Sequence, residues 1–83
     1  MKTRDEVLSQ IVRMSKGTPG CLRVLSDLFQ GGHTDVIDKL EQEAIYGSQV
    51  WILYKDRCGC DYDRLVNLVL STANLQALAK EEM

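Results

Sequence analysis

Three cysteines and one histidine are the first candidates in this sequence for binding a transition metal or for nucleophilic catalysis. Cys58 and Cys60 are separated by one residue, and Cys21 and His33 could complete a Cys₃His zinc site. Paired cysteines in structural zinc sites usually have about two to four residues between them. A nucleophilic cysteine also needs a base beside it. We therefore expect unliganded thiols, no metal or cofactor and no catalytic residue.

The segment Gly17-Thr18-Pro19-Gly20 leads into a predicted helix start, where free N–H groups favour an anion. Lys16 and Arg23 flank this corner and could add positive charge, and Trp51 and Tyr54 could stack on a base. The segment lacks the glycine pattern of a Walker loop or a dinucleotide fingerprint. An ordinary corner between two helices is therefore the alternative. The candidate ligand-binding residues are Lys16, Thr18, Gly20, Arg23, Trp51 and Tyr54.

The segment Val50-Trp51-Ile52-Leu53-Tyr54 is apolar on all sides when it is drawn as a helix. Such a helix is either central or at a contact between subunits. A buried strand is the competing interpretation, but no alternating partner strand occurs elsewhere in the sequence. The candidate interface residues are Val50, Trp51 and Tyr54.

The elements that must position these residues are predicted to be short helices. Thr3 and Glu6 have the spacing of a capping box, which starts a helix over residues 4–16. Pro19 suits the first position of the second helix, because its missing N–H costs nothing there. Further helix starts are predicted at Thr34, Ser48 and Asp61, and helix ends at Gly17, Gly31 and Gly47.

Apolar residues recur at helical spacing in these segments. The predicted buried faces are Val7, Leu8, Ile11 and Val12 in the first helix, Leu22, Leu25 and Phe29 in the second, and Val36, Ile37, Leu40, Ala44 and Ile45 in the third. A single long helix after Asp61 is predicted to reach beyond Leu75 and to fray over residues 79–83. The sequence thus predicts an all-α fold, a compact bundle of about five short helices in one domain over residues 1–83.

Size and charge limit the possible partners. A chain of 83 residues buries only about 60–65% of the surface of its unfolded form, so we expect self-association to add stability. The net charge of −2 makes nucleic acid an improbable partner. The longest strongly apolar run is too short to cross a bilayer, and the N-terminus lacks the apolar stretch of a secretory signal. We expect a cytoplasmic protein that does not interact with membranes.

The chain resembles a group of small, uncharacterised bacteriophage-encoded helical proteins. The resemblance rests on Pro19-Gly20-Cys21-Leu22 and on the block from Gly47 to Asp56, followed by Cys58 and Asp61, and it spans roughly residues 8–72. It implies a host-interaction or counter-defence role and carries over no catalytic residue.

These observations predict a non-enzymatic binding or interaction protein that acts on a host protein or as a homo-oligomer. One alternative is an oligomeric sponge that sequesters a nucleotide-derived small signal, with phosphates at helix starts and cationic side chains. The other alternative is a small zinc-binding or thiol protein built on the cysteines and the histidine.

Overall fold

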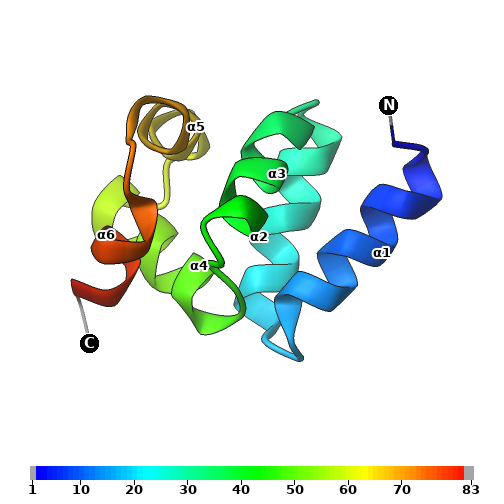
Figure 1. Ribbon diagram of the computed structural model, residues 1–83, viewed down its shortest axis with the longest axis horizontal. Coiled ribbons are helices and arrows are strands. Elements are labelled where there is room, and N and C mark those ends of the chain that lie inside the picture. Colours follow the sequence, from blue (N-terminus) through cyan, green and yellow to red (C-terminus); the bar gives the residue numbers. More distant parts are fainter. Residues whose placement is uncertain (1, 82–83) are drawn as a thin grey trace.

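The computed structural model describes residues 2–81, which form helices and no strand (Figure 1). The elements are α1 (Arg4–Ser15), α2 (Pro19–Gln30), α3 (Thr34–Gln42), α4 (Ser48–Ile52), the π-helix η1 (Leu53–Arg57), α5 (Tyr62–Ser71) and α6 (Leu75–Glu81). The predicted all-α class is confirmed. Within the described residues there are six α-helices, because the predicted last helix is divided in two.

Local capping signals set most of the helix starts. The Thr3 side chain accepts a hydrogen bond from the Glu6 N–H, and the Glu6 carboxylate accepts one from the Thr3 N–H, both at 3.2 Å. Pro19 is the first residue of α2, and the Asp61 carboxylate accepts from two backbone N–H groups at the start of α5. These three predictions are confirmed.

The third helix is shorter than the sequence suggested. It begins one residue after the N-cap residue His33 and ends at Gln42, not at Gly47. Ala44 adopts a left-handed φ of 59°, and the Ile45 N–H donates to the Leu40 carbonyl at 3.0 Å, which closes the end of the helix. Ala44 and Ile45 therefore belong to the following loop.

The apolar segment that follows is helical, so the competing strand interpretation is wrong. It begins at Ser48 as predicted, and after Ile52 it widens into η1, which ends at Arg57. Figure 1 shows α4 in the middle of the molecule. Val50, Leu53 and Tyr54 are buried, whereas Trp51 and Ile52 are partly exposed, so the segment is not enclosed on every side as predicted.

The predicted long final helix is wrong, because the chain breaks between Ser71 and Leu75. Thr72 has the extended dihedral angles φ −102° and ψ 126°. The Glu43 carboxylate then accepts hydrogen bonds from the N–H groups of Leu75 (2.8 Å) and Gln76 (3.3 Å), so a residue more than 30 positions away caps α6. The predicted fraying covered residues 79–83; Ala79 is fully buried in α6, and residues 82 and 83 lie outside the described residues.

The core lies between α2, α3 and α4, with α1 at one edge of the molecule and α5 and α6 at the opposite edge (Figure 1). Buried apolar side chains from α1, α2 and α3 are Val7, Ile11, Met14, Cys21, Val24, Leu25, Leu28, Val36, Ile37 and Leu40. The buried Gln10 amide donates to Asp38 and to Glu41, each at 2.9 Å, and so joins α1 to α3. No helix in residues 2–81 has the length and apolar character needed to cross a membrane.

Candidate functional site

Two of the residues predicted to bind a ligand, Lys16 and Thr18, lie together in a surface hollow of about 470 Å³. We call it the Lys16–Lys80 hollow. Its polar lining consists mainly of Lys16, Thr18, Tyr46, Gln49, Gln76 and Lys80. Its walls contain two ammonium groups and no carboxylate among the residues that the structure describes. The hollow is therefore electrostatically suited to an anion.

Backbone and ring contacts hold the wall of this hollow in place. The Gly47 N–H donates to the Met14 carbonyl at 2.8 Å, which fastens the α3–α4 loop to the end of α1. The Lys16 ammonium lies 4.7 Å from the centre of the Tyr46 ring, a cation–π contact. Lys16 and Ala44 both have left-handed backbone, with φ 48° and 59°. Two of the three non-glycine residues with positive φ in the described chain thus line one hollow.

The other predicted ligand residues lie elsewhere. Gly20 packs against the face of Trp51, so closely that a β-carbon on Gly20 would lie 2.8 Å from Cδ2 of the indole. Arg23 is exposed on α2 and does not line the Lys16–Lys80 hollow. The structure therefore does not bring the predicted set of six residues into one site.

Tyr54 is committed to contacts inside the fold. Its hydroxyl donates to the Cys60 carbonyl at 2.7 Å, and its ring stacks on Tyr62 with 4.6 Å between the ring centres. The Tyr62 hydroxyl donates to Asp27 at 2.6 Å, which links α5 to α2. Burial, and then the hydrogen bond to Asp27, hold the pKa of Tyr62 far above its usual value. Both rings are thus structural, with Tyr54 only 5% exposed.

The predicted interface set is reduced by burial within the chain itself. Val50 is fully buried and Tyr54 nearly so, whereas Trp51 is half-buried. Of these three side chains, only Trp51 retains appreciable surface that a partner could contact.

The cysteines do not form a metal site. No group of three His, Cys, Asp or Glu side chains within residues 2–81 is placed to hold a metal ion. Burial raises the pKa of the Cys21 and Cys58 thiols, and Cys60 is exposed. His33 is the N-cap residue of α3. The structure therefore gives the zinc alternative no ligand set within the described residues.

An apolar strip is exposed where α1 and α2 meet. Leu8, Val12 and Leu22 are 38%, 66% and 43% exposed, and Pro19 is exposed between them. Leu8 and Val12 line one shallow hollow, and Val12, Pro19 and Leu22 line an adjoining one. We call these four residues the apolar strip. Leu8, Val12 and Leu22 were predicted to be buried, and that prediction is wrong for all three.

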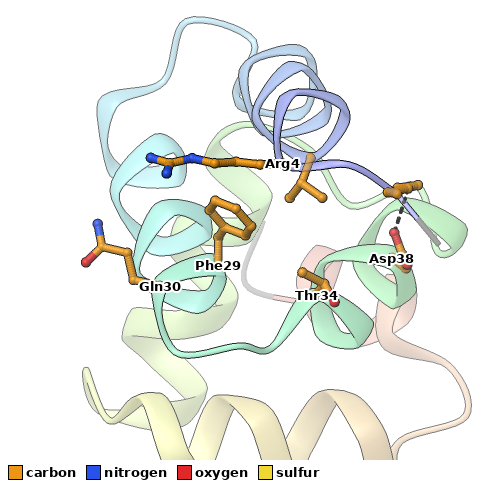
Figure 2. A pocket seen from close by; sticks show the side chains of 7 residues that line it. Arg4, Phe29, Gln30, Thr34 and Asp38 are labelled. Atoms are coloured by element: carbon orange, nitrogen blue, oxygen red, sulfur yellow. Dashed lines mark hydrogen bonds and ion pairs between the residues drawn. The ribbon is translucent and has the colours of Figure 1, made fainter.

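A second hollow, of about 630 Å³, lies between the start of α1, the end of α2 and the start of α3. Figure 2 shows the Phe29 ring pointing into it, with Arg4 along its rim. We call it the Phe29 pocket. Its lining is more apolar than that of the Lys16–Lys80 hollow.

No protein-family model, curated protein or solved structure matches this chain. The resemblance to bacteriophage-encoded proteins therefore stays a prediction.

Sequence reasoning missed several residues that line these surfaces. Tyr46 and Lys80 lie opposite Lys16 although they are 30 and 64 positions away. Arg4 and Phe29, which line the Phe29 pocket together, are 25 positions apart in the chain. Nothing in their spacing pairs them, and only the packing of α1 on α2 and of α6 on α4 brings them together. The exposed strip did leave a signal, because the apolar residues of the first helix span more of its circumference than one buried face requires.

Proposed function

We propose that this chain is a non-enzymatic interaction protein that associates with a second copy of itself through the apolar strip. The observation that carries the proposal is the exposure of Leu8, Val12 and Leu22 on one continuous surface. Large apolar side chains that gather at the surface of a small chain mark sites of association.

The strip is complementary to itself. Val12 is its centre, because it lines both the hollow with Leu8 and the hollow with Leu22. A two-fold axis through Val12 sets Leu8 of one copy against Leu22 of the other. Exposed charges flank the strip: Asp5 lies one turn before Leu8 on α1, and Arg23 is next to Leu22 in the sequence of α2. We propose that in this dimer the Asp5 carboxylate of each copy pairs with the Arg23 guanidinium of the second copy.

The exposed area predicts a weak, concentration-dependent dimer. The exposed fractions of the three large side chains amount to about 1.5 whole side chains per copy, or about three per dimer. At about 1.5–3 kcal/mol for each fully buried side chain, the gross gain is about 4–9 kcal/mol. Association costs about 4–15 kcal/mol in lost motion. The net gain is at most about 5 kcal/mol, so the dissociation constant should be about 0.2 mM or weaker.

Sedimentation equilibrium over a wide range of protein concentrations tests this proposal. The wild-type chain should change from monomer to dimer as concentration rises, whereas Val12→Asp should stay monomeric because it places a charge at the centre of the strip. Leu70→Asp is the matched control, since Leu70 is 48% exposed on α5 at the opposite edge of the molecule. A Val12→Asp variant that dimerises like wild type would refute the proposal.

A charge exchange then tests the two-fold arrangement. Asp5→Arg and Arg23→Asp should each weaken the dimer, because each creates two like-charge contacts. An equimolar mixture of the two variants should form a heterodimer, since each chain then supplies the charge that the other lacks. If the mixture associates no better than either variant alone, the arrangement through Val12 is wrong.

The Lys16–Lys80 hollow supports a second candidate function, the sequestration of a small phosphorylated molecule. The supporting observation is the pair of ammonium groups beside Tyr46, with no carboxylate among the lining residues that the structure describes. Isothermal calorimetry should detect ADP binding to the wild-type chain. The Lys16→Ala, Lys80→Ala double variant should bind no ADP. Lys55→Ala, which removes an exposed lysine on η1, is the control. Equal ADP affinity in the double variant and wild type would exclude this candidate.

A further inference from the structure

The Phe29 pocket plays no part in the association proposed above. It shares no lining residue with the apolar strip and is formed by the first two turns of α1, together with the last turn of α2 and the first turns of α3. Its volume of about 630 Å³ falls within the range of about 300–1,000 Å³ that small-molecule sites occupy. It is therefore large enough to enclose the apolar part of a small ligand.

The floor of the pocket is apolar. Val7 is 3% exposed and contributes its side chain from α1, and Phe29 is half-buried and points its ring into the space below α1 (Figure 2). Apolar atoms make up most of the surface of this pocket, whereas they make up less than half of the surface of the Lys16–Lys80 hollow. A hydrocarbon chain that packs on this floor is removed from water on at least one side. This burial is favourable in proportion to the apolar area covered.

The polar groups of the pocket are divided between its two sides. In Figure 2 the Arg4 guanidinium and the Gln30 amide lie on one side of the Phe29 ring, and Thr34 and Asp38 lie on the other. The Lys2 ammonium donates to the Asp38 carboxylate at 2.8 Å, so these two charges compensate each other.

Arg4 is the uncompensated charge of the pocket. It is exposed, and it forms no hydrogen bond or ion pair with any other residue in the range 2–81. A guanidinium presents paired N–H donors that match the two oxygens of a carboxylate. The Gln30 amide on the same side can act as a further donor.

We propose that the Phe29 pocket binds an apolar carboxylic acid. Its hydrocarbon part lies on Phe29 and Val7, and its carboxylate accepts hydrogen bonds from Arg4 and Gln30. A neutral alcohol of the same length gains only the apolar contact, and an amine is repelled by Arg4. Two sources share this chemistry: a free medium-chain acid, and the carboxyl end of a peptide with an apolar last residue.

The test is a titration of the ¹⁵N-labelled full chain with hexanoate, followed by two-dimensional NMR, with hexanol as the neutral probe. Hexanoate should shift the amide signals of Phe29, Gln30 and the first turn of α1, with a dissociation constant of about a millimolar. Arg4→Gln should weaken hexanoate binding about fivefold, to the level of hexanol, and leave hexanol binding unchanged. Arg64→Gln, the matched loss of an exposed arginine on α5, should change neither.

Acetyl-Ala-Ala-Leu and its C-terminal amide distinguish the two sources. Tighter binding of the peptide acid than of hexanoate, lost on amidation, identifies a peptide end; tighter binding of hexanoate identifies a free acid. The proposal is overturned if neither probe shifts the pocket signals, or if Arg4→Gln binds hexanoate as tightly as wild type. Thermal unfolding of Arg4→Gln verifies its fold, and because the exposed Arg4 side chain has no partner within residues 2–81 we expect no fall in the unfolding temperature.

Discussion

Replacing Gly20 with alanine should destabilise the protein, although alanine is the better helix former. Gly20 is the second residue of α2, and its α-carbon faces the Trp51 indole of α4. An added β-carbon would lie 2.8 Å from Cδ2, 2.9 Å from Cε3 and 3.0 Å from Cγ of the indole. Carbon atoms in ordinary contact are about 3.5–4.0 Å apart. The ring or the helix must therefore move by about half an ångström or more.

Two opposing terms set the magnitude. Inserting one methyl group into a packed contact costs about 1–3 kcal/mol. The higher helix propensity of alanine returns up to about 1 kcal/mol, and less than that in the first turn of a helix. The free energy of unfolding of Gly20→Ala should therefore fall by about 1–2 kcal/mol. For a chain of this length that lowers the melting temperature by roughly 4–16 °C.

A double-mutant cycle with Trp51→Leu identifies the cause. The smaller side chain makes room for the methyl group, so in that background Gly20→Ala should be neutral or slightly stabilising, with a coupling energy of about 2 kcal/mol. Urea unfolding followed by circular dichroism measures all four proteins without relying on tryptophan fluorescence. Equal effects of Gly20→Ala in both backgrounds would refute the reasoning, because the cost would then not come from the indole.

Three further predictions follow from backbone geometry, titration and exposure. Ala44→Gly should stabilise the protein by about 0.5–1 kcal/mol in thermal unfolding, because φ 59° strains alanine but not glycine; an unchanged melting temperature would contradict this. Hydrogen bonds from Lys2 lower the pKa of Asp38, and those from Arg13 lower the pKa of Glu41. The free energy of unfolding should therefore be constant while the pH is above the ordinary pKa values of 3.8 and 4.5, and should fall as the pH drops below them. The double variant Asp38→Asn, Glu41→Gln should show a smaller decrease over the same pH range. Ellman's reagent should titrate one thiol per native chain, at Cys60, and the two buried thiols only after unfolding; rapid reaction of all three would contradict the burial.

Helix starts could be predicted from the sequence because their signals are local. The Thr3–Glu6 capping box, Pro19 and the Asp61 cap each lie within three residues of the backbone groups that they satisfy or constrain. The all-α class followed from the same local patterns. Ser48 was likewise correct as the first residue of α4.

Helix ends were harder because tertiary contacts decide them. The break in the last helix was missed because residues 65–79 contain neither glycine nor proline, and the local signal is Asn74, whose side chain accepts a hydrogen bond from the Ala77 N–H at 3.4 Å. The break depends on Glu43, whose carboxylate satisfies the first N–H groups of α6 from 32 positions away. The end of α3 was missed for a related reason, because Ala44 adopts the left-handed conformation that usually signals glycine.

The candidate sites divide in the same way. Lys16 and Thr18 are close in sequence and share a hollow, as their spacing suggested. Lys80, which supplies the second cation of that hollow, enters only because α6 folds back on α4. Tyr54 was predicted to contact a ligand or a partner. Its side chain instead contacts Tyr62 and Cys60 inside the fold.

The apolar strip cannot be explained by folding alone. An edge helix needs one apolar face, and Val7, Ile11 and Met14 already give α1 a face that is almost completely buried. Val12, which is 66% exposed, contributes little to the stability of the monomer and leaves apolar surface in water. A polar residue there would cost the isolated fold almost nothing, whereas in a two-fold dimer it would occupy the centre of the contact. If Val12→Asp leaves the melting temperature of the dilute monomer unchanged while it abolishes the dimer, the side chain acts in association and not in folding.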